Sequence, residues 1–220
     1  MRSITYKLSS SLYVSLTNRS NAQSLMRSRG PGFTMPSTSG FALLPDGFEP
    51  SAADVVSAVE TELDVTAAGG TPFASVVFAG AGEPLLRLRV LEEAATTLAA
   101  SQRAERLRLN TNGLVPRTQA AETAARLKKA RISAVTMAIA TADPEQFLEL
   151  MEPEKLRLSP GFSLQLGHAE VIEFARACLA EELAVEMTAV ARPGVDIPRA
   201  RSLAESLGAS FRERSWHPAG

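Results

Sequence analysis

Short apolar runs rich in β-branched residues alternate along the chain with segments whose apolar residues recur at helical spacing. Strands buried on both faces of a parallel sheet have this nearly continuous apolar character. The alternation therefore predicts an α/β fold with a parallel sheet. The expected strands are Leu12 to Thr17, Phe73 to Ala79, Arg106 to Asn110, Ala134 to Ala140, Val185 to Val190 and Phe211 to Trp216.

Helices are expected to connect these strands. Ser51 and Asp54 form a capping-box pattern before the first helix, and the last helix begins after Asp196 and ends at Gly208. Strands with helical crossovers of this kind predict an open, partial (βα)6 barrel, in which ligands bind beyond the carboxyl ends of the strands. The expected apolar helix faces are Val55, Val56, Val59 and Leu63; Leu88, Leu91, Ala95 and Leu98; Ala121, Ala124, Ala125 and Leu127; Val171, Phe174, Ala175 and Cys178; and Ala200, Leu203, Ala204 and Leu207.

A long connection, residues 20 to 49, is rich in Ser, Gly and Pro. Loops of this length are usually functional or disordered, and this one leaves the carboxyl end of the first strand. Residues 1 to 45 contain no Asp or Glu but include Arg2, Lys7, Arg19, Arg27 and Arg29. We therefore expect the 20–49 loop to be mobile and to dock an unidentified protein or a small anionic ligand, although solvated charges are an alternative explanation.

Composition and charge exclude several classes of protein. The 220 residues are 45% hydrophobic and 21% charged, which predicts a single domain spanning residues 1–220. With a net charge of −1, the chain as a whole lacks the positive charge that is typical of proteins that bind nucleic acid or an anionic membrane surface. Without a long apolar run or a secretory signal, a cytoplasmic protein is expected. The Ser-rich, Arg-bearing start also fits an organelle transit peptide, but a strand read from Tyr6 to Leu16 argues against cleavage there.

Four stretches at successive strand ends carry a family resemblance. They are SLYVSLTNR from Ser11, FAGAGEPLL from Phe78, NTNGL from Asn110, and GVDI from Gly194 with the later Phe211-Arg212. In this order they resemble the TatD-associated branch of the radical SAM superfamily. The resemblance covers nearly the whole chain and implies a radical-SAM-type TIM barrel. It also implies that two turns contact S-adenosylmethionine, through Gly80, Gly82, Glu83 and Pro84 and through Thr111, Asn112 and Gly113.

Each of these turns also has a purely structural explanation. The turn at Gly80 to Pro84 is a tight strand-to-helix connection whose acidic residue is favoured by the helix dipole. In the second turn, Asn112 and Gly113 supply left-handed backbone angles. The sequence leaves both explanations open.

The cysteines of the family's cluster motif are absent from this chain. Three cysteines, separated by three and then two residues, follow the Thr-Asn-Arg of the family, and here the ungapped positions are Ser20, Ser24 and Arg27. Cys178 is the sole cysteine. Thiolates hold iron–sulfur clusters, whereas a serine hydroxyl is neutral at pH 7 and a guanidinium offers no acceptor. We therefore expect no 4Fe-4S cluster.

The fourth strand departs from the family as well. Polar positions that reach the cosubstrate in relatives fall, without gaps, on Ala138 and Ala140. Neither side chain can form a hydrogen bond, so each buried ligand hydroxyl there would lose about 1 to 3 kcal/mol. The resemblance thus implies weak binding of S-adenosylmethionine, with a dissociation constant on the order of 1 mM.

The remaining candidate residues are isolated. Cys178 lies on an apolar helix stripe and is expected in the core, while His168 and His217 lack partners at metal spacing and are expected in surface or capping roles. The sequence predicts a cysteine-less radical SAM-fold pseudoenzyme with a binding or regulatory role. The alternative is an enzyme that binds S-adenosylmethionine and uses non-radical chemistry at the strand ends, with Glu83, Asp143, Glu145 or His217. A mutated or misread active relative is a third explanation, which sequencing the DNA for residues 18 to 30 resolves.

Overall fold

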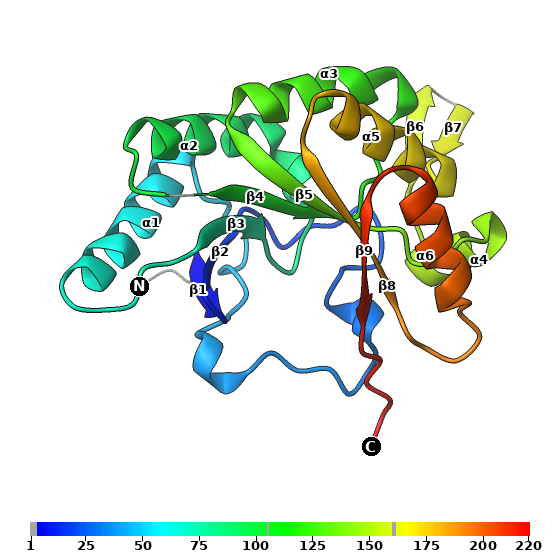
Figure 1. The fold of residues 1–220 in the computed structure, drawn as a ribbon, viewed down its shortest axis with the longest axis horizontal. Coiled ribbons are helices and arrows are strands. Elements are labelled where there is room, and N and C mark those ends of the chain that lie inside the picture. Colours follow the sequence, from blue (N-terminus) through cyan, green and yellow to red (C-terminus); the bar gives the residue numbers. More distant parts are fainter. Residues whose placement is uncertain (1–3, 105, 160–161) are drawn as a thin grey trace. The chain divides into compact units, whose positions relative to one another are not determined.

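A computed structural model describes residues 4–104, 106–159 and 162–220. Arg2, one of the cationic residues noted above, lies outside this range. Hydrogen bonds join seven strands in the order β1-β2-β3-β4-β5-β8-β9, and β6 and β7 form a separate two-stranded hairpin (Figure 1). The larger sheet is mostly parallel and is not closed, which confirms the predicted α/β class and the open, partial barrel.

The expected strands are all present. They are β2 (Ser11–Ser15), β3 (Ser75–Ala79), β4 (Leu107–Thr111), β5 (Ile132–Ala138), β8 (Ala184–Val190) and β9 (Ser210–Arg214). The hairpin of β6 (Lys155–Ser159) and β7 (Phe162–Gln165) was not predicted.

The strand expected from Tyr6 to Leu16 is instead a hairpin. β1 (Thr5–Leu8) pairs antiparallel with β2, and Leu8 lies opposite Ser11. Ser9 adopts a φ of 51°, which reverses the chain between the two strands. The prediction of one strand was therefore wrong, because two polar turn residues interrupt an otherwise strand-like pattern.

The five expected helices are also present, together with one that was missed. The helices are α1 (Ala52–Ala67), α2 (Leu88–Ala100), α3 (Arg117–Lys129), α4 (Pro144–Met151), α5 (His168–Ala180) and α6 (Ile197–Ser206), and the short 3-10 helices are η1 (Arg27–Arg29), η2 (Ser37–Ser39) and η3 (Pro84–Arg87). The capping box of α1 forms as predicted, because Ser51 and Asp54 exchange backbone-to-side-chain hydrogen bonds. The missed α4 is only eight residues long, too short for a clear apolar period.

The chain divides into two compact units. The first unit comprises the residues up to Ser20, Thr34–Asn110 and Arg126–Ala134. In it β2 and β3 run parallel, with Leu12 opposite Val76 and Val14 opposite Phe78, and all four side chains are buried. Helices α1 and α2 pack against each other (Figure 1).

The second unit comprises Asn21–Phe33, Thr111–Ala125 and Val135–Gly220. In it β8 and β9 run parallel, with Met187 opposite Phe211, and α5 packs against β8. Cys178 is 0% exposed on α5, which confirms its predicted place in the core. Across the described part of the chain, every helix is too short or too polar to cross a bilayer.

Candidate functional site

The Gly80 to Pro84 turn of the first unit is built against the end of β2. Gly80 has a φ of 125°, and a Cβ atom there would lie 2.7 Å from the Oγ of Ser15. A Cβ on Gly82 would lie 2.4 Å from the carbonyl oxygens of Thr17 and Arg19. Both positions therefore require glycine, because the backbone of the turn lies directly against the Thr17 to Arg19 segment.

Glu83 also forms hydrogen bonds within this turn. Its side chain is only 3% exposed and accepts a 3.0 Å hydrogen bond from the Leu85 amide, which caps η3. The Glu83 amide donates a 2.8 Å hydrogen bond to the carbonyl of Arg19. The turn thus forms a stable strand-to-helix connection from its own contacts.

The Thr111 to Gly113 turn of the second unit is buried. The Thr111 hydroxyl accepts a hydrogen bond from the Gly113 amide at 3.0 Å, and the Asn112 side chain accepts one from the Leu114 amide at 2.9 Å. The amide group of Asn112 also donates to the Asn21 side chain at 2.7 Å. Asn112 therefore fastens the start of the 21–33 segment to the turn.

Ser24 and Arg27, two of the positions that the family resemblance aligns with cluster cysteines, present no thiolate. The Ser24 hydroxyl accepts a hydrogen bond from the Arg27 amide at 3.2 Å, and the Arg27 side chain is exposed. Within the described ranges, no group of three or more His, Cys, Asp or Glu side chains is placed to hold a metal ion. Burial raises the pKa of the Cys178 thiol to about 12, so it is not available as a thiolate. These donors do not fit an iron–sulfur cluster.

Residues 21–33 are nevertheless held in place by backbone hydrogen bonds within the second unit. Near their start, the Gln23 amide donates to the Met151 carbonyl at 2.6 Å, and the Glu154 amide donates to Asn21 at 2.8 Å. Near their end, the His217 amide donates to the Arg29 carbonyl at 2.8 Å. The two ends of this segment are thus fastened by the protein's own backbone hydrogen bonds.

Ala138 and Ala140 line a small, mostly apolar cavity in the second unit. Its volume is about 30 Å³, and Leu25 and Met151 contribute to its wall. A volume of this order holds about one water molecule and no organic ligand. Ala140 adopts a φ of 58°, an unfavourable backbone angle for a residue other than glycine.

A larger cavity of about 660 Å³ opens in the same unit. Cationic and anionic side chains both line it, together with two aromatic rings: Arg27, Arg192, Glu149, Glu152, Phe33 and Trp216. The sequence patterns identified only Arg27 as a candidate among these. Arg192 lies two residues beyond the end of β8, and Trp216 lies two residues beyond the end of β9. Their position after the carboxyl ends of strands could have marked them as candidates.

Two of the residues considered for non-radical catalysis, Glu83 and Asp143, cap helices. Asp143 caps α4 by accepting hydrogen bonds from the amides of Glu145 and Gln146, which lowers the pKa of its carboxyl. His168 is 5% exposed and lies 2.9 Å from the Thr141 carbonyl, so the expected surface role was wrong. Burial lowers the pKa of His168, although the hydrogen bond to Thr141 and the charge of Asp143 oppose this shift.

Comparison with known proteins gives a likeness of fold. Neither a protein-family model nor a curated protein sequence matches the chain. Among solved structures, Streptococcus suis SuiB bound to S-adenosylmethionine aligns with a TM-score of 0.64 and 13% identity over 96% of this chain. A radical SAM methyltransferase from Sphaerobacter thermophilus aligns with a TM-score of 0.58 and 12% identity over 93%. HydG, a maturase of the [FeFe]-hydrogenase, aligns with a TM-score of 0.55 and 12% identity over 94%.

The aligned region is only part of each of these proteins. The chain spans 42% of SuiB, 66% of the methyltransferase and 43% of HydG. Identities this low carry information about the fold and not about the reaction. The chain therefore has the fold of the radical SAM enzymes.

Proposed function

We propose that this protein is a ligand-binding pseudoenzyme of the TatD-associated branch, which binds S-adenosylmethionine weakly and carries out no radical chemistry. One observation carries the proposal: the sole thiol, Cys178, is fully buried on α5 with its pKa raised to about 12. It cannot serve as the ligand that the Ser20, Ser24 and Arg27 positions lack.

The chemistry of the donor set supports this conclusion. Iron–sulfur clusters depend on thiolate donors, and a neutral hydroxyl is a poor replacement at pH 7. The guanidinium of Arg27 carries donors only, and its positive charge would repel iron. Because the cluster supplies the electron that cleaves S-adenosylmethionine in radical SAM enzymes, a chain without it has no route to that step.

We expect the two turns to bind S-adenosylmethionine only weakly, because few of their polar groups are available to a ligand. The Gly80 to Pro84 and Thr111 to Gly113 turns keep their backbone groups, but Glu83 and Asn112 already form hydrogen bonds within the protein. The side chains of Ala138 and Ala140 offer the ligand no polar atoms. We expect a dissociation constant on the order of 1 mM.

Two measurements on the purified protein test the proposal. Calorimetric titration with S-adenosylmethionine should give millimolar affinity, and incubation with S-adenosylmethionine and a strong reductant should yield no cleavage products. Micromolar binding would show that the site is intact. Reductive cleavage above a protein-free control would overturn the proposal.

A further inference from the structure

We propose that the larger cavity of the second unit binds a small zwitterionic ligand. Arg27 and Arg192 hold its anionic group, and Glu149 and Glu152 face its cationic group. The inference rests on the proposed function, because it supplies the ligand class for a protein that binds without radical chemistry.

The charges that line the cavity are not neutralised by one another. Among the described residues, neither arginine forms an ion pair with Glu149 or Glu152, although all four side chains line the same cavity. Other arginines of this unit do find carboxylates: Arg212 lies 2.6 Å from Glu186. Arg27, Glu149 and Glu152 are exposed, so water solvates their charges in the free protein. A bound zwitterion would replace that water with an oppositely charged partner for both sets of side chains.

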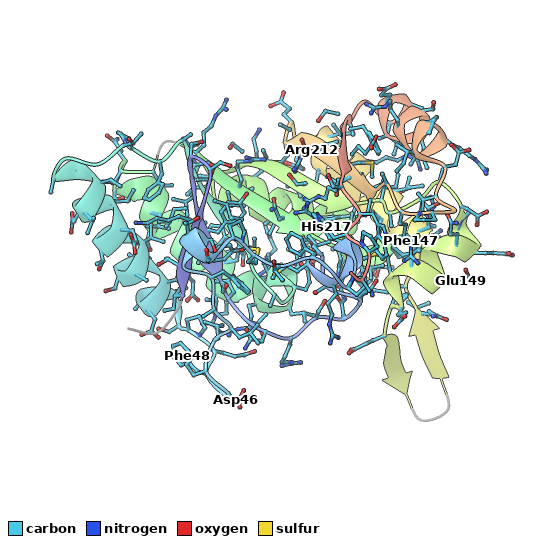
Figure 2. All side chains as sticks on the ribbon, turned by 90° about the horizontal axis from the view of Figure 1, so that it is seen from below. Asp46, Phe48, Phe147, Glu149, Arg212 and His217 are labelled. Atoms are coloured by element: carbon cyan, nitrogen blue, oxygen red, sulfur yellow. The ribbon has the colours of Figure 1, made fainter. Side chains whose placement is uncertain are left out.

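The two sets come from different elements. Arg27 begins η1 and Arg192 follows β8, whereas Glu149 lies in α4 and Glu152 caps its end. Figure 2 labels Glu149 on α4 and His217 in the segment that follows β9. The separation of the two signs onto different elements favours a ligand with its own charges at opposite ends.

Aromatic rings orient the cationic side. The Arg192 guanidinium lies 4.9 Å from the ring centroid of Trp216, and the Arg29 guanidinium lies 4.2 Å from that of Phe33. Stacking over a ring leaves the in-plane N–H groups of a guanidinium available to a carboxylate or phosphate. Arg29 does not line the cavity itself; its pKa is lowered mainly by burial and secondarily by the charge of Arg212.

Size and charge together select the ligand class. A volume of about 660 Å³ falls within the range of pockets that hold small organic molecules. The two glutamates would repel a polyanion such as a nucleic acid, and the two arginines would repel a polyamine. An amino-acid-like or dipeptide-like molecule with a free amino group and a free carboxylate can pair with both the glutamates and the arginines.

Trp216 provides a direct readout, because it is the sole tryptophan and it lines the cavity. The probe is the dipeptide leucyl-leucine, compared with its N-acetylated form and its C-terminal amide. The free dipeptide should change Trp216 fluorescence saturably with a dissociation constant on the order of 1 mM. Each blocked form should bind about 10-fold more weakly, because each loses one charge-assisted interaction.

Charge-neutral variants assign the two ends. In Arg27→Gln the difference in affinity between the free dipeptide and its amide should shrink, and in Glu149→Gln the difference between the free and N-acetylated dipeptides should shrink. Arg192 and Glu152 remain, so neither difference should vanish. Arg89→Gln is the matched control, since Arg89 is exposed on α2 in the first unit, and it should bind as the parent protein does. Equal binding of all three probes to the parent protein, or no saturable signal, would overturn the inference.

The outcomes also separate this inference from the proposed function. Dipeptide binding by a protein that cleaves S-adenosylmethionine would refute the proposed function and leave the cavity's ligand class standing. A protein without cleavage activity and without dipeptide binding would refute the ligand class alone.

Discussion

The amide of His217 donates a 2.8 Å hydrogen bond to the carbonyl of Arg29, and the Gly32 amide returns one to the His217 carbonyl at 3.0 Å. The C-terminal tail is thus paired, backbone to backbone, with residues 29–32, in the loop that the family resemblance aligns with a cluster-binding loop. A Cβ atom on Gly30 would lie 2.2 Å from the same His217 carbonyl oxygen. We call this arrangement the tail–loop pairing.

Gly30→Ala should break the tail–loop pairing. The residue has a φ of 106°, so alanine adds backbone strain of about 1 to 3 kcal/mol to the clash with His217. Hydrogen exchange should become faster in residues 21–33 and in the tail. Gly47→Ala is the matched control, because Gly47 has a φ of 70° and open space around it. Unchanged exchange in Gly30→Ala would show that the pairing does not hold the segment.

Ala140→Gly should stabilise the protein by roughly 0.5 to 1 kcal/mol. The left-handed angle of Ala140, with a φ of 58°, costs alanine about 1 to 2 kcal/mol, which exceeds the added flexibility of glycine in the unfolded chain. Ala138→Gly should instead destabilise it, because Ala138 lies in β5 without such an angle. Urea unfolding followed by circular dichroism measures both, and a loss of stability in Ala140→Gly would contradict the strain.

Stability should fall as the pH drops below about 6.5, in part through His168. Burial lowers the pKa of His168 from its ordinary 6.5, so below that value the unfolded state binds a proton more readily than the folded state. The contribution is fully present above pH 6.5 and is lost as the pH falls through the folded pKa. Urea midpoints at pH 7.5 and 5.5 should therefore differ less in His168→Asn than in the parent.

His217→Asn is the matched control for this comparison, since it removes the other histidine and keeps His168. It should retain the parent's loss of stability at pH 5.5. An equal loss in His168→Asn and in the parent would exclude His168 as the cause.

The 20–49 loop should not exchange uniformly. Residues 34–43 are held mainly by local contacts and by an edge-to-face contact of Phe41 with Tyr6, whereas Asn18 exchanges two hydrogen bonds with Leu44. Arg87 also donates a 2.9 Å hydrogen bond to Glu49. We expect fast amide exchange in 34–43 and slower exchange in 21–33, so uniformly slow exchange through 20–49 would contradict the predicted mobility.

The sequence predicted the architecture well, because its strands are short apolar runs and its helices have clear caps. It missed the turn at Ser9, where two serines interrupt an apparent strand. It also missed α4, whose start is fixed by Asp143 and Pro144 rather than by an apolar period. The boundaries of these two elements depend on turn and capping residues, which the pattern of apolar positions does not reveal.

Less of the candidate site could be predicted, because it depends on contacts between distant residues. The motifs located the two turns and the missing cysteines, but not the pairing of His217 with Arg29, which are 188 positions apart. Arg192 and Glu149 likewise belong to no motif, and only the fold brings them to one cavity. Residues that meet through tertiary structure leave no pattern in a single sequence.

The iron and sulfide content after anaerobic reconstitution tests the central claim most directly. Reconstitution should leave the protein without a stoichiometric cluster and without its broad brown absorbance, because the only thiol is the buried Cys178. Cys178→Ser should give the same result as the parent. About four irons per chain with a cluster spectrum would contradict the account, whatever ligands supplied the site.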